Sequence, residues 1–380
     1  MNRLLIAAAC AAVLSFASPA DAAVSISGFG QVVVGTTGDD AEPFPERNFD
    51  SDKDFKEESL FAVQVSADLN EHIDVIAQVL ARGDKDFDAE LAWAYANMRL
   101  GDAFKLKAGR QRLGLFRYSD YLDVGYAYPW VRPPVSVYNL GFNNADGLSL
   151  SHDAQLGNWF SQAQLFVGGF SGDARTGGEY LDTKLKSLMG VSWTVDYADW
   201  LSLRAAYYKA DVEYVRGTSL DTLEALLTGN GFGALASSLV YDGDPGVFWG
   251  MGAQIDRGNL LLVAEFTSTD IDDSLFAPTD GWYLSAGYRF GSVMPIVTLG
   301  SKTSDAKLEL LDGIPTQNPF YLPILGAVSS QAADEDYAGI GLRWDFMSNI
   351  AFKADYTRYR SDISGVPDSD LLSAGVVFTF

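Results

Sequence analysis

The chain has 380 residues, 13% aromatic residues, a mean hydropathy of +0.02 and a formal net charge of −23. This charge argues against nucleic-acid binding, which needs a basic surface. Near-zero hydropathy with many aromatic residues fits strands that present one face to lipid and the other to water, because the two faces cancel in an average.

The first residues have the pattern of an export signal. Asn2 and Arg3 give a short positive start, Leu4–Phe16 is apolar, and Ala20-Asp21-Ala22 is a small-x-small cleavage site. We therefore expect residues 1–22 to be removed and residues 23–380 to form one domain. The only cysteine, Cys10, lies in the removed segment, so no disulfide is expected in the mature chain.

Sixteen segments of about ten residues follow, in which apolar and polar residues alternate. No segment of 10–15 residues with helical periodicity, typical of an α/β protein, separates them. An even number of strands places both chain ends on the same side of a closed sheet. The predicted fold is an all-β, transmembrane antiparallel β-barrel, and its strands are Val24–Thr36, Ser59–Leu69, Ile73–Arg82, Ala89–Leu100, Phe104–Arg112, Asp146–Ser151, Asn158–Phe170, Leu188–Ala198, Leu201–Val212, Val247–Asp256, Leu260–Thr269, Gly281–Phe290, Val293–Thr303, Asp336–Phe346, Asn349–Arg360 and Asp370–Phe380.

The alternation distinguishes this barrel from a soluble β-sandwich. Ile340, Leu342 and Trp344 alternate with Gly341 and Arg343. Elsewhere too, the polar faces carry charges in mid-strand and the apolar faces carry aromatic residues at strand ends, as a membrane-interface girdle requires. A soluble sandwich produces such alternation in some strands, but it does not require mid-strand charges on the polar face together with aromatic residues at the strand ends.

The connections alternate between tight turns and long loops, the asymmetry of outer-membrane barrels. The turns are Asn70–His72, Asp199-Trp200, Arg257–Asn259, Gly291-Ser292 and Met347-Ser348. The loops are Thr37–Glu58, Leu113–Ala145, Ser171–Ser187, Glu213–Gly246 and Ser304–Glu335.

At this point the chain resembles Gram-negative porins. The resemblance rests on the exported start, the following VSISGFG at Val24–Gly30, sixteen strands, the terminal aromatic Phe380, and KAGRQR at Lys107–Arg112 before a long loop. It implies an outer-membrane channel with periplasmic termini, assembled as a homotrimer, through which small hydrophilic solutes and ions diffuse. The Pro-Glu-Phe-Gly-Gly motif of enteric general porins is absent from Leu113–Ala145, so their constriction geometry is not carried over.

The first long loop, Thr37–Glu58, holds nine acids and three bases. It is either a solvated acidic surface or a place where divalent cations bridge to lipopolysaccharide. Outer-membrane lipid and lipopolysaccharide are the partners that the resemblance implies.

A sixteen-strand barrel is wide unless a loop enters it. Leu113–Ala145 is the candidate, because three prolines restrict its backbone and its tyrosines offer both packing surface and polar tips. A cap packed above the barrel is the alternative.

The charges near this loop suggest a mild preference for anions. Six bases (Lys105, Lys107, Arg110, Arg112, Arg117 and Arg132) accompany two acids (Asp120 and Asp123). The alternation of apolar and polar residues also places Arg204, Arg289, Arg343 and Lys353 on the water-facing side of their strands. Glu265, Asp345 and Asp355 lie on the same side and carry the opposite charge. The alternative for each arginine is a salt bridge within the wall.

Two further features stay open at this stage. Trp93 and Tyr95 share one face of their strand, which is either a stacking surface for sugars or a lipid-facing one. In the loop Glu213–Gly246 we expect a short helix capped by Asp221 and ended by Gly229–Gly231.

An enzyme is not expected, because His72 and His152 both lie by periplasmic turns and no metal, phosphate or nucleophile motif is present. No cofactor is expected. The alternatives to a general porin are a channel specific for a sugar or small organic anion, and a plugged structural or adhesive barrel.

Overall fold

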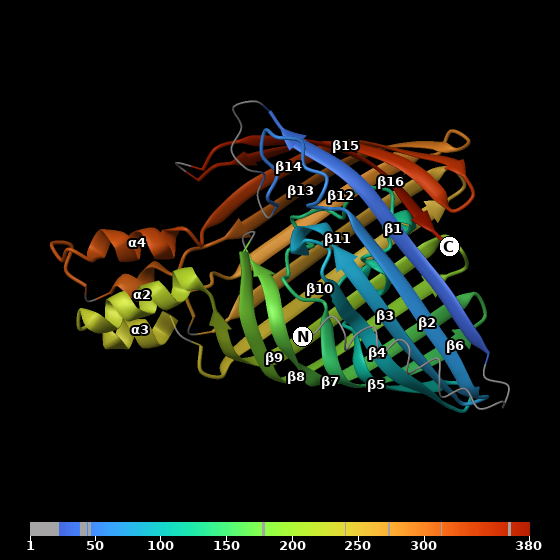
Figure 1. Ribbon diagram of the computed structural model, residues 1–380, viewed down its shortest axis with the longest axis horizontal. Helices are drawn as coiled ribbons and strands as arrows, with labels where there is room; N and C mark the ends of the chain where they lie inside the picture. The colour runs from blue at the N-terminus through green and yellow to red at the C-terminus, as the bar shows by residue number, and fades with distance from the viewer. Residues whose placement is uncertain are drawn as a thin grey trace.

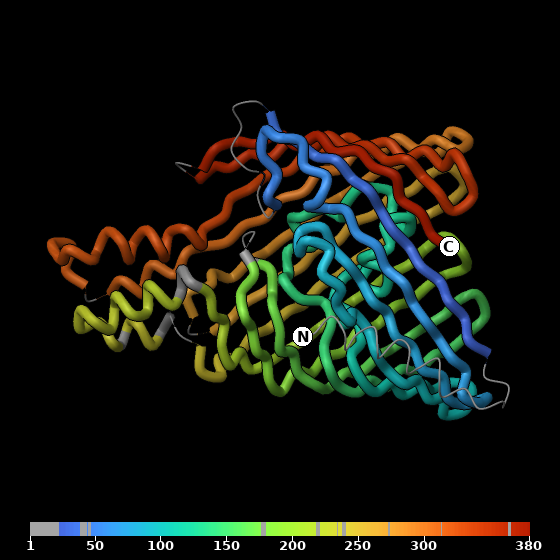
Figure 2. The backbone as a smooth tube through the Cα atoms, in the orientation of Figure 1, coloured from blue at the N-terminus to red at the C-terminus, as the bar shows by residue number. Residues whose placement is uncertain are grey.

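The computed structural model contains a closed antiparallel barrel of sixteen strands (Figures 1 and 2). It describes residues 23–38, 44, 47–176, 179–239, 241–272, 274–312, 314–363 and 366–380. The predicted signal, 1–22, and part of the acidic loop lie outside the described residues. No helix in the described part of the chain is long and apolar enough to cross a membrane.

The strands follow chain order around the barrel, and β1 pairs with β16 to close it. Their bounds are β1 Val24–Thr37, β2 Leu60–Asn70, β3 Ile73–Arg82, β4 Ala89–Leu100, β5 Phe104–Arg112, β6 Asn144–Leu156, β7 Trp159–Thr176, β8 Glu179–Tyr197, β9 Leu201–Arg216, β10 Asp244–Arg257, β11 Leu260–Ile271, β12 Thr279–Tyr288, β13 Val293–Ser304, β14 Ala333–Met347, β15 Ile350–Ser361 and β16 Ser369–Thr379.

The prediction of a closed antiparallel barrel with sixteen strands is confirmed, but one loop was predicted wrongly. The segment Ser171–Ser187 was expected to be a long loop, but β7 and β8 continue through it and pair as far as Thr176 and Glu179. Beyond the membrane neither face of a hairpin meets lipid, so the apolar alternation that identifies a strand fades there.

Helices gather at the long-loop end of the barrel (Figure 1). They are α2 Thr218–Gly229, α3 Gly233–Leu239 and α4 Tyr321–Ser329. The predicted helix exists as α2, but the cap was wrong: Gly217 is its N-cap, and Asp221 lies in the first turn. Leu227, Ala236, Leu311, Ile324 and neighbouring apolar residues form a small core of their own at this end.

The two faces of the wall differ as predicted. On β14, Ile340 and Trp344 are exposed toward the membrane side, whereas Arg343 between them contacts groups inside the barrel. On β16 the exposed Leu372 and Val376 alternate with the buried Ser373 and Val377.

Candidate functional site

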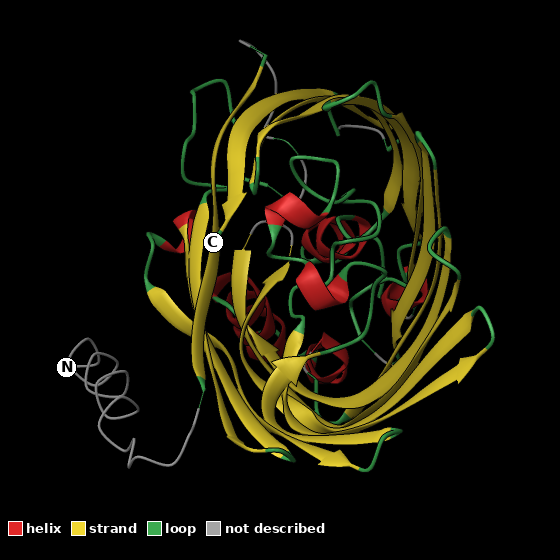
Figure 3. Cartoon of the chain, turned by 90° about the vertical axis from the view of Figure 1, so that its right-hand side faces the viewer, coloured by secondary structure: helices red, strands yellow, loops and turns green. Residues whose placement is uncertain are grey.

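Residues 113–143 connect β5 to β6 and lie inside the barrel, where Figure 3 shows loops within the ring of strands. We call this segment the lumen loop. Its prolines and glycines keep it irregular apart from two single-turn 3₁₀ helices, Ser119–Tyr121 and Gly125–Ala127. The infolded arrangement, rather than a cap above the barrel, is therefore the one found.

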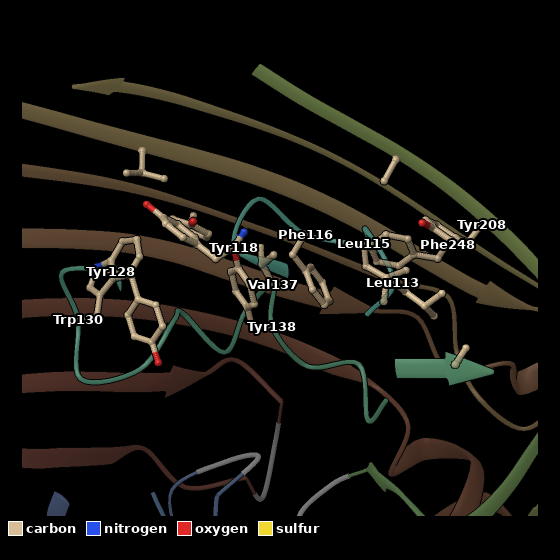
Figure 4. Close-up of a cluster of buried hydrophobic side chains, with 14 of the residues drawn as sticks. Leu113, Leu115, Phe116, Tyr118, Tyr128, Trp130, Val137, Tyr138, Tyr208 and Phe248 are labelled. Atoms are coloured by element: carbon tan, nitrogen blue, oxygen red, sulfur yellow. The ribbon is translucent and has the colours of Figure 1, made fainter. Parts of the chain in front are cut away.

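Aromatic packing holds the lumen loop to one side of the barrel (Figure 4). Phe116 meets Phe248 of β10 edge-on at 5.5 Å between ring centroids, and Trp130 meets Tyr283 of β12 at 5.6 Å. This shared core draws its wall residues from β6 to β13. Since aromatic rings bury large areas, the loop has a fixed position on this wall.

Lys353 of β15 is a buried anchor for the same loop. Its ammonium group donates to the carbonyl oxygens of Gly125, Tyr128 and Trp130, the latter two at 2.6 Å. Arg343 donates to the carbonyl oxygens of Tyr126 and Tyr128 at 2.7 and 3.1 Å. Carbonyls that would otherwise be left without partners in a turn are thereby satisfied.

Glu265 of β11 ties a second part of the loop to the wall. It is buried, accepts a hydrogen bond from the Tyr283 hydroxyl at 2.6 Å, and also accepts from the Tyr138 hydroxyl and the backbone N–H of Arg117. The carboxylate is thus occupied in holding the loop and does not project freely into the lumen.

Asp123 in the loop is clamped by two arginines of the opposite wall. Arg82 donates to it at 2.5 Å, Arg112 donates to its other oxygen, and the carboxylate is 5% exposed. Burial by itself raises the pKa of Asp123, but the charges of Arg112 and Arg82 outweigh it and hold that pKa well below its usual range. The lumen loop therefore touches both sides of the barrel.

Two further ion pairs join the loop to the wall. Asp120 accepts from Arg204 of β9 at 2.9 Å, and Arg132 binds Glu58 at 2.7 Å and Ser373 at 2.9 Å. Glu58 is itself buried, two residues before β2 begins at Leu60.

Close approach of backbones requires glycine at the loop contact on β12. A Cβ atom on Gly281 would lie 1.9 Å from the carbonyl oxygen of Ser136 in the loop. The wall glycine is thus explained by the loop packed against it.

Large cavities remain on several sides of the loop. The cavity at the long-loop end has a volume of about 420 Å³ and is lined by six bases and seven acids. The cavity between the loop and β3–β7, at the short-turn end, measures about 350 Å³ and has three bases and two acids. A third, beside β10–β14, measures about 370 Å³ and has two of each.

Most of the bases expected to line a pore are engaged in ion pairs. Lys105 pairs with Asp153 at 2.7 Å, and Arg289 pairs with Asp256 at 2.6 Å. Arg343 pairs with Asp345 at 2.8 Å, besides its bonds to the loop. Within the described part of the chain, neither the Lys107 ammonium group nor the Arg117 guanidinium has a carboxylate within ion-pair distance. The Arg117 guanidinium donates to the Tyr121 hydroxyl at 3.5 Å and lies over the Tyr118 ring.

Arg110 lies among the residues that line the long-loop cavity. In the register of β5 with β6, Arg110 pairs with Asp146, and the two side chains form an ion pair at 2.9 Å. Both side chains line the long-loop cavity and remain 40% and 55% exposed, so this ion pair lies at the rim of that cavity.

Several charged residues at the site were missed from the sequence, namely Arg82, Glu58, Glu57, Asp84 and Arg175. Arg175 binds Glu57 and, at 2.9 Å, Asp84 across the long-loop cavity. Counting charges within one stretch of sequence could not identify these residues, because they come from loops and strands far away along the chain.

The register also settles the orientation of β4. Tyr95 lines the cavity beside β3–β7, with its ring 6.5 Å from that of Trp93. Ala94 and Ala96 point the other way, toward the membrane. The aromatic face is therefore the inner one.

Comparison with known proteins gives one family. A family model for Gram-negative porins matches residues 7–380. No curated protein sequence matches the chain.

Among solved structures, the fold is shared by an anion-selective porin from Comamonas acidovorans (12% identity, TM-score 0.58, 95% of this chain and 100% of that one). Salmonella typhi OmpF, in complex with daunomycin, is similar at 15% identity and TM-score 0.58, over 94% and 97% of the two chains. The trimer form of Vibrio cholerae OmpT is similar at 11% identity and TM-score 0.53, over 94% and 99%.

Proposed function

Because this chain belongs to the Gram-negative porin family, and is thus an outer-membrane channel and not an enzyme, we propose that it is a weakly selective general pore. Small hydrophilic solutes and ions would diffuse passively past the lumen loop. The observation that carries this proposal is the near balance of fixed charges around that loop, with six bases and seven acids at one end and five bases and four acids at the other.

Paired charges of both signs suit a general pore. They create a transverse field that favours polar over apolar solutes, while their nearly equal numbers leave little net potential to sort ions. Open cavities on both sides of the loop support a channel over a plugged structural or adhesive barrel.

A mild anion preference is part of the proposal. The sequence count of six bases to two acids leaves out three carboxylates from elsewhere in the chain: Asp153 pairs with Lys105, Asp146 with Arg110 and Glu58 with Arg132. What supports a residual preference is the cavity beside β3–β7, where three bases face two acids. We propose Lys107 as its main determinant.

Planar-bilayer recording tests this function. We expect ohmic single-channel steps and, in a KCl gradient, a reversal potential displaced slightly toward that of chloride. Clear cation preference would contradict the anion preference alone. An almost complete absence of current from correctly folded protein would contradict the pore itself.

We further propose a homotrimer, processed after Ala22 and surrounded by outer-membrane lipid and lipopolysaccharide. Ala94 and Ala96, small and outward-facing on β4, would allow close approach of a second barrel. An unheated gel that shows only a monomeric band would remove the trimer.

A further inference from the structure

We propose that the cavity between the lumen loop and β3–β7 is a binding subsite for a small hydroxylated monocarboxylate, such as a sugar acid. We call it the Lys107 subsite. It rests on the pore of the proposed function, because a solute must enter the lumen to reach it. Its volume, about 350 Å³, lies within the range of small-molecule sites, about 300–1,000 Å³.

The charge available for a ligand in this cavity is that of Lys107. The other charged residues that line it are engaged: Arg99 with Asp74 at 3.2 Å, Lys105 with Asp153, and Asp120 with Arg204. Among the described residues, no carboxylate lies within ion-pair distance of the Lys107 ammonium group. One unpaired cation matches one carboxylate, and a charge-assisted hydrogen bond is the strong kind.

Tyr95 fixes the position of that cation and adds an apolar surface. The Lys107 ammonium group lies 5.3 Å from the centroid of the Tyr95 ring, a cation–π contact. Trp93 continues the aromatic strip beyond Tyr95, toward the long-loop end. Such rings offer a face against which the C–H groups of a sugar ring can pack.

Hydrogen-bond acceptors around the cavity favour hydroxyl groups. Gln162 and Gln164 each donate from the side-chain amide nitrogen to a neighbour, Asp153 at 2.9 Å and Ser149 at 3.1 Å, which leaves their carbonyl oxygens as acceptors. Asn97 likewise donates to Asp74 at 3.0 Å, while its buried Oδ1 atom has no partner in the structure. A carboxylate without hydroxyls would leave these acceptors unused.

The test is solute block in bilayers, with D-glucuronate as the probe and D-glucose and acetate as comparators. In the native channel, added glucuronate should interrupt the current more strongly than either comparator. The Lys107→Gln variant should lose about tenfold or more in the blocking constant, as expected for removal of a charge-assisted hydrogen bond. Tyr95→Leu should weaken glucuronate block and leave the small effect of acetate unchanged.

Lys105→Gln is the matched control, because it removes the same charge from the same cavity at a base that is already paired with Asp153. It should lose clearly less block than Lys107→Gln, since Lys105 is already engaged by a carboxylate. Equal block in Lys107→Gln and the native channel, or equal block by glucose and glucuronate, would overturn the subsite. Normal conductance without any block would overturn it while leaving the pore intact, whereas absent conductance would count against the proposed function.

Discussion

At the scale of single residues, the loop is positioned by buried charges that would be costly without partners. Lys353 has three backbone carbonyls, Glu265 has two tyrosine hydroxyls and an N–H, and Asp123 has two arginines. Removing one partner from a buried charge costs several kcal/mol, far more than for an exposed pair. These groups therefore act on loop position more than on ion selectivity.

The clamp of Arg82 and Arg112 on Asp123 predicts a distinctive pH profile. A lowered pKa means that the stabilisation is complete above the ordinary aspartate pKa, about 3.9, and is lost as pH falls through the lowered value. Open-channel noise should thus stay constant from pH 7 to about 4 and rise only in stronger acid. Asp123→Asn should show the noise already at pH 7 and lose about 3–5 kcal/mol on urea unfolding in lipid vesicles.

Asp146→Asn provides the comparison, since the pair of Asp146 with Arg110 is 55% and 40% exposed. An exposed pair contributes about 0–1 kcal/mol. Equal losses of unfolding free energy in Asp123→Asn and Asp146→Asn would contradict the prediction that the buried pair contributes more than the exposed one.

At the scale of elements, the loop and the wall that receives it depend on each other. Ser136 donates to the carbonyl oxygen of Trp282 at 3.0 Å, directly beside Gly281. The backbone of Ser136 fits against β12 because Gly281 has no Cβ at the point of contact.

Gly281→Ala should therefore displace the loop into the lumen. The new methyl would meet the backbone of Ser136, so we expect lower single-channel conductance and a loss of about 1–3 kcal/mol in stability, as for other overpacked sites. Gly339→Ala on β14 is the control, because its nearest atoms would lie 3.5 Å or more away. Unchanged conductance in Gly281→Ala would mean that the loop yields without moving into the pore.

The same scale shows what could be predicted from sequence. Alternation placed every membrane-crossing strand, because lipid on one side and water on the other impose period two. It failed in the outer parts of β7 and β8, which continue as a paired hairpin through the segment expected to be a loop. The lumen loop was identified by its length and prolines, but its ion pairs were not. Arg82, Glu58 and Asp153 are brought to the site by the strand register and by the course of the loops, which the sequence does not show.

At the scale of the whole molecule, the helices at the long-loop end form a unit separate from the lumen loop that narrows the channel. The core built by α2, α3, α4 and the neighbouring loops lies at the long-loop end, apart from the core that holds the lumen loop.

Replacing residues 218–239 and 308–329 by short Gly/Ser linkers should leave single-channel conductance and reversal potential unchanged. Long surface loops tolerate such changes because closure entropy varies slowly with length. Replacing residues 118–138 of the lumen loop in the same way should raise conductance strongly. If removal of the helices altered conductance as much, the exterior would belong to the pathway.

The pairing of β1 with β16 has a consequence for biogenesis. Phe29 pairs with Thr379, 379 − 29 = 350 positions later, so the first strand has no partner on one side until the last strand has been made and exported. Every intermediate on the way carries two bare sheet edges, which are templates for aggregation. Cells that make this protein must therefore shield the incomplete sheet in the periplasm, and a truncation that removes β16 should yield aggregates or degradation products in place of a smaller channel.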